Sequence, residues 1–402
     1  MTRRIRIVIV GAGITGLTTA GVLARSRHAG SLELTVVDAA ERPAHDPAAE
    51  VGLRVSAISA GSTQLLDSIG AWQPVLSARA CPYERMRVWD AAAAADGPST
   101  LRFDADAYGV AELGHIVENL LVQSVLMDVL DRQRIDIRFC TTLAAMDTDG
   151  RRYRIELGDG EQIDTDLVIA ADGRASPVRE QAGIAVSRHV YGQTAFVTHA
   201  RTEKPHRYTA WQRFLDTGPL ALLPLADGRV SIVWSTTPEL AAHALEAADT
   251  DIGATLTVAS DRVLGSLTPD GPRGAFPLRA QHAGRYVLPG LALIGDAAHA
   301  VHPLAGQGAN LGLQDVRSLC EVIDSALGRG EFPGDRLVLR RYERARKGAN
   351  ATMMHFLTGL NRLFASESRL IGGLRRGGMR LFNASGPLRD RAIGAALGVP
   401  RR

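Results

Sequence analysis

Near the end of the chain the sequence reads Leu293-Ile-Gly-Asp-Ala-Ala-His-Ala-Val-His-Pro-Leu-Ala-Gly-Gln-Gly-Ala-Asn310. An apolar run over residues 286–294 predicts a strand that ends at Gly295-Asp296. A loop broken by proline follows. Gly306-Gln-Gly308 then opens a predicted helix over about residues 309–327, where apolar residues recur at helical spacing. The stretch is therefore a strand, a loop rich in small residues and a helix N-terminus.

Each part of this stretch suits a flavin. A carboxylate at the carboxyl end of a strand, here Asp296, can accept hydrogen bonds from the hydroxyl groups of a polyol. Small residues let backbone approach a planar ring, and a helix N-terminus offers free N–H groups and positive potential to an anion. Reduced flavin is such an anion, since negative charge gathers at the pyrimidine end of its ring. The stretch therefore predicts a socket for the ribityl chain and the isoalloxazine ring.

A second motif stands at the N-terminus. Residues 5–10 and 32–37 predict two strands, and between them lies a turn with three glycines, Gly11, Gly13 and Gly16. A helix is predicted from residue 17, and Asp38 lies 22 residues after Gly16. This is the dinucleotide-binding fingerprint, in which a helix N-terminus faces a pyrophosphate and the acid binds the adenosine ribose. The glycine motif alone is weak evidence, but the strands and the acid around it favour nucleotide binding over a structural turn.

A third strand, predicted over residues 166–171, ends at Asp172-Gly173. An Asp-Gly pair by itself usually marks a plain turn. Here it repeats the pattern of a strand that ends in an acid, and it stands between the other two motifs along the chain. From the residues alone both interpretations stay open, a turn or a further contact to the same ligand.

Together the three motifs resemble those of the aromatic-ring hydroxylases, the single-component flavin monooxygenases of the para-hydroxybenzoate hydroxylase type. Further segments look like those of the ubiquinone-biosynthesis hydroxylases: Arg54-Val-Ser-Ala-Ile-Ser59, Gly114-His-Ile-Val-Glu-Asn119 with Gln123, Arg213-Phe214, and Gly218-Pro-Leu-Ala-Leu-Leu-Pro-Leu225. The resemblance covers about residues 5–395. One departure is Ala309, where relatives often carry a bulkier apolar residue.

The resemblance implies a FAD-dependent aromatic-ring monooxygenase with an α/β fold, in which a Rossmann-like FAD-binding domain is joined to a β-sheet substrate domain and C-terminal helices. It implies that NAD(P)H binds transiently and that O2 then reacts to give a flavin C4a-hydroperoxide. No second GxGxxG follows a strand, which suits a reductant without a domain of its own. FAD is expected to be non-covalent, because no Cys or His stands in a recognisable attachment motif.

The resemblance also implies roles for individual residues. Pro303, Gly306 and Gln307 are expected at the site of oxygen chemistry. Contacts to FAD are expected from Gly11, Gly13, Gly16, Asp38, Arg54, Gln123, Asp172, Gly173, Gly295, Asp296, Gly306, Gly308, Ala309 and Asn310. The cofactor carries the hard chemistry, so the protein's tasks are to hold a phenol near it, exclude water and stabilise charge.

The middle of the chain is rich in predicted strands, over residues 194–200, 208–215, 220–225 and 229–235. Such a sheet can form a wall that faces the flavin. Its inner face is expected to line an apolar substrate pocket with Phe214, Leu223, Pro224 and Trp234, although ordinary core packing is the alternative for each aromatic. The expected division is a FAD-binding domain of residues 1–74, 99–181 and 278–340, a substrate domain of 75–98 and 182–277, and a helical region of 341–402.

Composition agrees with a two-domain enzyme. The chain has 402 residues and 46% hydrophobic content, enough for two cores. Three separated cysteines, Cys81, Cys140 and Cys320, predict neither a disulfide framework nor a metal site. The first strand begins at once and no apolar run reaches the roughly 18 residues of a membrane span, so a cytoplasmic location is expected.

The net charge of +3 hides an asymmetry along the chain. Residues 341–402 contain 13 Arg and Lys against three acidic residues, a net charge of +10, and their apolar residues recur at helical spacing. These helices either pack on the FAD-binding domain with solvated arginines, or form a basic amphipathic surface for anionic lipid or an acidic partner. No nucleic-acid-binding motif accompanies the basic residues.

The expected substrate is a polyprenylated phenol or benzoquinol of ubiquinone biosynthesis, hydroxylated with O2 and NAD(P)H. A lipid-tailed substrate would suit an enzyme that sits peripherally on the inner face of the membrane, alone or in a biosynthetic complex. The alternatives are a hydroxylase of another aromatic, such as a secondary metabolite, and a non-catalytic prenyl-lipid carrier on the same fold. An intact flavin socket argues against the carrier. A flavin halogenase does not fit, because neither lysine, Lys204 or Lys347, is a candidate for that family's catalytic lysine.

Overall fold

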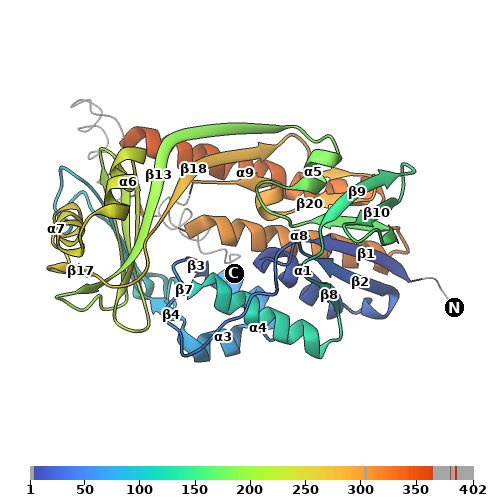
Figure 1. The fold of residues 1–402 in the computed structure, drawn as a ribbon, viewed down its shortest axis with the longest axis horizontal. Coiled ribbons are helices and arrows are strands. Elements are labelled where there is room, and N and C mark those ends of the chain that lie inside the picture. Colours follow the sequence, from blue (N-terminus) through green and yellow to red (C-terminus); the bar gives the residue numbers. More distant parts are fainter. Residues whose placement is uncertain (1–3, 303–305, 365–380, 382–384, 387–402) are drawn as a thin grey trace.

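The computed structural model describes residues 4–302, 306–364, 381 and 385–386. Figure 1 shows an elongated molecule with a mainly parallel sheet at one end and a large, mainly antiparallel sheet at the other. Two long strands, β13 (Val186–Thr202) and β18 (Gly274–Ala283), and the helix α9 (Arg336–Phe364) extend between the ends. The chain thus forms two lobes that share connecting elements.

The first lobe is built on a six-stranded sheet of order β19-β20-β12-β1-β2-β8. Its strands are β1 (Ile5–Val10), β2 (Leu32–Val37), β8 (Asp136–Arg138), β12 (Leu167–Ala170), β19 (Val287–Leu288) and β20 (Leu291–Leu293). Val10 pairs with Val37 on one side and Ala170 on the other, and Ala170 pairs with Leu293, all in parallel. The three predicted motifs therefore leave the sheet at the same carboxyl edge.

Helices and a small sheet complete the core of this lobe. Buried apolar residues come from the helices α1 (Ile14–Ala24), α4 (Asn119–Arg132) and α8 (Gln307–Gly328). More come from a three-stranded sheet of β9 (Leu143–Thr148), β10 (Tyr153–Leu157) and β11 (Gln162–Thr165), and from the short helix α5 (Pro177–Gln181). The helices predicted from residues 17 and 309 are confirmed. Both begin earlier, because residues of the preceding glycine turns already adopt helical geometry.

A second three-stranded sheet, of order β3-β7-β4, lies between the two lobes (Figure 1). Its elements are β3 (Val55–Ser59), β4 (Cys81–Tyr83) and β7 (Gly114–Glu118), with the helices α2 (Ala60–Ser68) and α3 (Trp72–Arg79) beside them. Ala57 and Ile116 of this sheet share an apolar cluster with Leu223 and Leu225 of the second lobe. The segment that contains Arg54 is therefore part of the joint between the lobes.

The second lobe is a nine-stranded sheet. Besides β13 and β18 it contains β5 (Arg85–Asp90), β6 (Leu101–Asp104), β14 (Thr209–Leu215), β15 (Gly218–Pro224), β16 (Val230–Thr236), β17 (Leu267–Pro269) and β21 (His299–Ala300). The four strands predicted here are confirmed. The sheet extends past the expected domain limits at 98 and 277, because β6 pairs with β5 as far as Asp104 and β18 pairs with β13 as far as Ala283.

One face of this sheet is covered by the helices α6 (Pro238–Glu246) and α7 (Asp249–Ala259). Phe196, Leu222 and Ile232 pack against Ala241 and Leu256 of these helices in a buried cluster. We call this the outer face, and the opposite one, which meets the first lobe and α9, the inner face.

A buried carboxylate, Asp315 of α8, joins α9 to the first lobe. Its oxygens accept hydrogen bonds from the Gly295 N–H (3.1 Å), Arg346 Nε (2.8 Å) and Asn350 Nδ2 (3.1 Å), and His299 Nε2 lies within hydrogen-bond reach. Burial alone would raise the pKa of Asp315, but His299 and Arg346 outweigh it and lower that pKa. The carboxylate therefore ties β20, β21, α8 and α9 together.

Helix α9 begins at Arg336, earlier than the limit of 341 expected for the helical region. The predicted helix is confirmed as far as Phe364, but its apolar stripe only in part: Leu357 and Phe364 are buried, whereas Phe356 and Leu363 are exposed. The helices expected after Phe364 lie outside the described residues, apart from 381 and 385–386.

The Asp315 network predicts a stability effect. Asp315→Asn leaves the Arg346 guanidinium without its ionic partner, so urea unfolding should show a loss of about 3–5 kcal/mol. Because the pKa of Asp315 is lowered, its contribution is present above the ordinary carboxyl pKa and is lost as pH falls through the lowered value. The difference between wild type and variant should therefore shrink in acid.

Asp324→Asn is the matched control on the same helix. Asp324 pairs with the exposed Arg27 at 3.1 Å, and such a surface pair contributes about 0–1 kcal/mol. Equal losses at the two positions, or a loss at Asp315 that does not depend on pH, would contradict the account.

Candidate functional site

The turn after β1 is held by the acid after β2. The half-buried Asp38 carboxylate accepts the backbone N–H groups of Ala12 (2.6 Å) and Ala40 (2.8 Å). Gln123 of α4 reaches the same turn, since its Nε2 donates to the Ala12 carbonyl at 3.3 Å. A carboxylate has about four lone-pair sites, so Asp38 retains acceptor capacity for a ribose hydroxyl. The structure thus brings the predicted residues Asp38 and Gln123 together at Gly11–Gly16.

The glycines of this turn have different neighbours. A Cβ on Gly16 would lie 1.9 Å from the Gly11 carbonyl oxygen, and one on Gly11 would lie 2.3 Å from the Ala171 carbonyl oxygen. These two glycines are required for the turn to close. A Cβ on Gly13 would meet no described atom within 4 Å, and Gly13 is the N-cap of α1. Open space in front of a helix N-terminus fits a phosphate.

Asp296 follows β20, in the short helical turn Gly295–Ala297. Desolvation by the surrounding protein raises the pKa of Asp296, while His299, Arg174 and Arg54 oppose that shift. The residue is nevertheless exposed to solvent. A carboxyl with both properties is reachable from solvent and yet largely surrounded by protein. Asp296 and Arg54, which the sequence analysis assigned to the same ligand, therefore lie within electrostatic reach of each other.

Asp172 and Gly173 follow β12 at the same edge. Burial raises the pKa of Asp172, and the Val178 N–H, which donates to Asp172 Oδ2 at 3.0 Å, opposes the shift. Arg179 donates to the Ala297 carbonyl at 2.8 Å and so connects α5 with the Asp296 turn. A Cβ on Gly173 would face open space among the described residues. Both interpretations of the Asp-Gly pair are compatible with this geometry, because a turn is formed and room for a ligand remains.

The N-terminus of α8 presents the loop expected to face the ring. Gly306 has φ of +62°, and a Cβ there would come within 2.8 Å of the Ala57 Cβ. A Cβ on Gly308 would meet nothing within 4 Å in the described part of the chain. Ala309 is half-buried and packs against the main core. Pro303 and the Gln307 side chain lie outside what the structure describes. Gly306 thus shapes the loop, while Gly308 borders open space.

Asn310 has a different task from the predicted contact with the ring. Its Oδ1 accepts the Ser59 N–H (2.9 Å) and the Ser62 hydroxyl (2.8 Å), and its Nδ2 donates to the Ala57 carbonyl (2.8 Å). The buried amide therefore fastens β3 and α2 to α8. Only the backbone of Asn310 is left to face a ligand.

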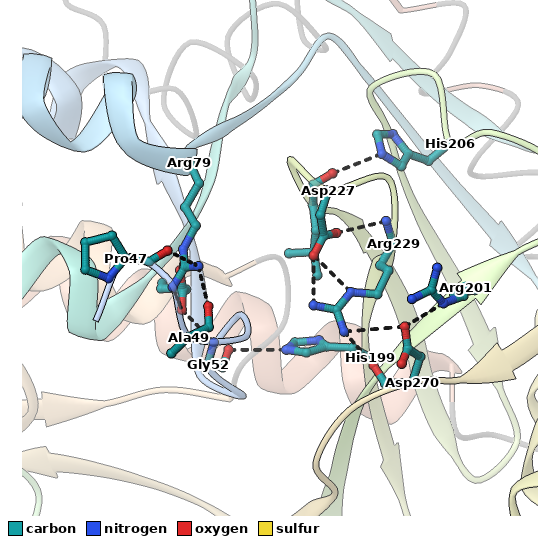
Figure 2. Close-up of polar contacts among 12 residues, drawn as sticks. Pro47, Ala49, Gly52, Arg79, His199, Arg201, His206, Asp227, Arg229 and Asp270 are labelled. Atoms are coloured by element: carbon teal, nitrogen blue, oxygen red, sulfur yellow. Dashed lines mark hydrogen bonds and ion pairs between the residues drawn. The ribbon is translucent and has the colours of Figure 1, made fainter. Parts of the chain in front are cut away.

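The segment before Arg54 is contacted from α3 on one side and from β13 of the second lobe on the other, as Figure 2 shows. Arg79 of α3 donates to the Ala49 carbonyl at 2.8 Å, and His199 of β13 lies 3.3 Å from the Gly52 carbonyl. Burial lowers the pKa of His199, which favours the neutral ring at this contact. The exposed Arg54 therefore extends from a segment whose position is fixed.

Ion pairs hold the strands of the second lobe that lie beside this contact (Figure 2). Arg229 donates to the Asp227 carboxylate at 2.8 Å and to the Asp270 carbonyl at 2.8 Å, and Arg201 pairs with the Asp270 carboxylate at 2.7 Å. These contacts hold the turn between β15 and β16 against the strands next to it. Polar contacts therefore fix residues on both sides of the joint between the lobes.

The four residues predicted to line the substrate pocket do not share one face of the sheet. Leu223 packs with Ala57 of β3, and Phe214 stacks on Phe364 of α9 with ring centroids 3.8 Å apart, so both lie on the inner face. Trp234 belongs to the outer cluster under α6 and α7. Pro224 lies two residues after Leu222 and four after Leu220 in the same strand, so it points to the same face as these two residues, which is the outer one. The prediction is wrong for Trp234 and Pro224. The alternation of side chains along a strand shows which residues share a face of the sheet, but not which of the two faces is the inner one.

Two residues outside the predicted set also belong to this region. Asp315 was detectable in principle, as a charged residue beside Leu313 and Val316 in the apolar stripe of α8. His302 was visible only as a histidine before a proline. Among the described residues, no group of three or more His, Cys, Asp or Glu is placed to hold a metal ion. Nor does any described helix have the length and apolar character needed to cross a bilayer.

The residues present fit an extended dinucleotide. Open space at Gly13 and at Gly308 lies at two helix N-termini, and Asp296, at the carboxyl edge of the same sheet, is exposed. FAD suits this arrangement, because it has groups that accept N–H hydrogen bonds at both ends and hydroxyl groups between them.

Comparisons with known proteins agree with this geometry. The family described as FAD binding domain matches residues 4–356. The chain is 35% identical over 397 residues to the 3-demethoxyubiquinol 3-hydroxylase of Escherichia coli, covering 98% of both chains. It is 35% identical to the ubiquinone hydroxylase UbiL of Rhodospirillum rubrum, covering 98% of this chain and 89% of the relative.

A similar fold occurs in the solved structure of PqsL from Pseudomonas aeruginosa in complex with 2-aminobenzoylacetate. The TM-score is 0.76 at 21% identity, covering 92% of this chain and 99% of that one. The expected α/β fold and the expected FAD are confirmed. The chain belongs to the FAD-binding-domain family and, within it, to the FAD-dependent monooxygenases that include the ubiquinone-biosynthesis hydroxylases.

Proposed function

We propose that the enzyme hydroxylates a phenol or benzoquinol ring that carries a polyprenyl tail, with O2 and NAD(P)H as co-substrates. The proposal rests on the 35% identity to a relative named 3-demethoxyubiquinol 3-hydroxylase, which extends over 98% of this chain. A similarity of that extent includes the substrate wall as well as the cofactor motifs. When bound, FAD supplies the redox chemistry, since it takes a hydride from NAD(P)H and activates O2.

In this proposal FAD lies without a covalent bond along the carboxyl edge of the first lobe. Asp38 holds the ribose, and the turn before α1 holds the pyrophosphate with Arg54 and Gln123 beside it. Asp296 holds the ribityl chain, and Asp172 with Gly173 lies near the same region. Gly308 and the first N–H groups of α8 face the pyrimidine end of the ring. The supporting observations are the open space at Gly13 and Gly308 and the exposed Asp296 carboxyl.

Pro303, Gly306 and Gln307 are proposed to border the site of oxygen chemistry, on the strength of the resemblance. The FAD-binding and substrate domains of the proposal correspond to the first and second lobes. Helix α9 and the residues after it form the C-terminal region.

The substrate ring is proposed to lie between the N-terminus of α8 and the inner face of the nine-stranded sheet. This face is apolar: Val233 and Leu278 share a cluster with Leu53, and Leu223 packs against Ala57. Apolar surroundings exclude water, which would otherwise compete for the activated oxygen. The protein's part is thus to orient the ring and keep the site dry.

The loop before α8, proposed to face the flavin ring, gives a test that separates cofactor contact from folding. A valine at Gly308 would fill space free of described atoms, so Gly308→Val should retain wild-type urea stability as apoprotein while FAD affinity falls at least tenfold. A valine at Gly306 would require φ of +62° and a contact of 2.8 Å with Ala57, so Gly306→Val should lower both. FAD titration and urea unfolding of both apoproteins give the comparison. Unchanged FAD affinity in Gly308→Val would rule out the ring assignment.

A lipid-tailed substrate gives the C-terminal region a function. Helix α9 leaves Leu337, Phe356 and Leu363 exposed, and residues 341–402 carry a net charge of +10. Exposed apolar residues and basic charge together suit weak, reversible binding to anionic lipid, where each basic residue adds about 1 kcal/mol. We propose that the enzyme associates peripherally with the inner face of the cytoplasmic membrane, where its substrate resides.

Liposome flotation tests this association. Binding should rise with the fraction of anionic lipid and fall with added salt, because the attraction is screened. The triple variant Arg375→Gln, Arg376→Gln, Arg380→Gln should bind less. A control that loses the same charge in the first lobe should bind like wild type: Arg4→Gln, Arg132→Gln, Arg134→Gln. Equal binding by both triple variants, or no binding by the wild type at low salt, would refute the proposal.

Quinone profiling of a deletion strain identifies the substrate. The strain should accumulate a polyprenylated intermediate that lacks one ring hydroxyl, and wild-type protein should restore the mature quinone while Gly308→Val should not. Accumulation of a different aromatic would favour the secondary-metabolite alternative. Restoration by a FAD-free variant would instead favour the non-catalytic lipid carrier.

A further inference from the structure

The imidazole of His302 is contacted by two residues of β13, Gln193 and Tyr191. Its Nε2 lies 3.2 Å from Oε1 of Gln193 in β13. Tyr191 meets the ring edge-on, with centroids 4.7 Å apart, and the Tyr191 hydroxyl lies 2.8 Å from Thr358 Oγ1 of α9. His302 itself is only 1% exposed. The His302 ring is thus held by β13, and α9 acts on it only through the Tyr191 hydroxyl.

The hydrogen bonds of Gln193 define which nitrogen of His302 carries the proton. Gln193 Nε2 donates to the Thr217 carbonyl at 3.0 Å, so the amide oxygen is the atom that faces His302. An amide oxygen only accepts, and Nε2 of His302 must therefore be the donor. Nδ1 is left as an unprotonated acceptor. Gly218 makes room for this arrangement, because a Cβ there would come within 2.6 Å of Gln193 Nε2.

This acceptor has no donor of its own in the described structure. His302 Nδ1 is buried, and no described residue donates a hydrogen bond to it. A buried acceptor without a donor costs about 1–3 kcal/mol, and a ligand that brings a donor removes that cost. Burial lowers the pKa of His302 to about 4, so the ring is neutral near pH 7 and its lone pair stays available.

The position of His302 indicates the ligand. The residue follows β21 and comes four residues before Gly306, where the loop turns into α8. Its neighbour Tyr191 belongs to the inner-face cluster that also contains Val233 and Leu278. A hydrogen-bond acceptor between an apolar wall and the cofactor loop is suited to a ring that carries a hydroxyl group.

We propose that Nδ1 of His302 accepts a hydrogen bond from the hydroxyl group of the substrate ring and thereby decides which ring position faces the flavin. The inference rests on the proposed function, because it takes the hydroxylated ring from it. No proton is transferred: the neutral imidazole accepts the O–H, which stays on the phenol. Gln193 acts as a positioning residue that keeps Nδ1 unprotonated, and Tyr191 packs against the ring edge-on.

Ligand binding by the FAD-loaded protein tests the inference without turnover. The probes are 2-geranylphenol and its methyl ether, which differ in the single donor, and binding is followed by the change in flavin absorbance. Wild type should bind the phenol about tenfold more tightly than the ether, as one hydrogen bond to a buried acceptor allows. His302→Leu should bind both compounds alike. His302→Asn retains an acceptor near the place of Nδ1, so part of the preference should return.

Controls separate this role from a structural one. The ratio of FAD to protein confirms that each variant folds, and His189→Leu, which changes only the far neighbour of Tyr191, should keep the wild-type preference. If His302→Leu loses FAD, Gln193→Leu takes its place: without the Gln193 amide the tautomer is no longer defined, and the preference should fall.

The outcomes distinguish the inference from the function on which it rests. A phenol preference that persists in FAD-loaded His302→Leu, or a wild type that binds phenol and ether equally, overturns the His302 assignment and leaves the proposed function standing. A wild type that binds neither compound shows that the substrate class is wrong, and the assignment of His302 falls with it.

Discussion

The parallel register of four strands is the constraint on which the rest of the molecule depends. Leu293 pairs with Ala170, Ala170 with Val10, and Val10 with Val37, so β20, β12, β1 and β2 all end at one edge. Every motif that follows these strands is therefore delivered to the same place, although the motifs are separated by more than a hundred residues along the chain. The glycine turn can close there because Gly11 and Gly16 have no side chains. The proposed cofactor site is thus a consequence of strand pairing.

Buried polar contacts then attach the rest of the chain to that edge. Asp315 collects donors from β20 and α9 and has His299 of β21 within hydrogen-bond reach, which fixes the turn at Asp296. The loop before Arg54 is fastened by Arg79 of α3 and meets His199 of β13 in the second lobe. The inner face of the large sheet is consequently held opposite the N-terminus of α8. An enzyme that presents a ring in one orientation needs the surfaces on both sides of the ring in fixed positions.

The parts that the sequence predicted well depend on short-range patterns. Apolar strands that end in glycine or acid at Gly11, Asp172 and Asp296 were recognisable because each pattern spans only a few residues. The errors concern long-range geometry. Alternation in β16 placed Trp234 on one face of the sheet, but only the packing of α6 and α7 shows that this face is the outer one. Likewise, nothing local shows that the Asn310 amide is used up by Ser59, Ser62 and Ala57.

The central claim is that the enzyme inserts one oxygen atom from O2 into an aromatic ring at the site between the two lobes. Turnover of a prenylated phenol or quinol under labelled ¹⁸O2 in ordinary water, with the product examined by mass spectrometry, tests it most directly. The account predicts that one labelled oxygen appears in the ring hydroxyl and that product forms in proportion to NAD(P)H consumed. A product whose new oxygen comes from water, or NAD(P)H oxidation that yields only hydrogen peroxide with every such substrate, would contradict it.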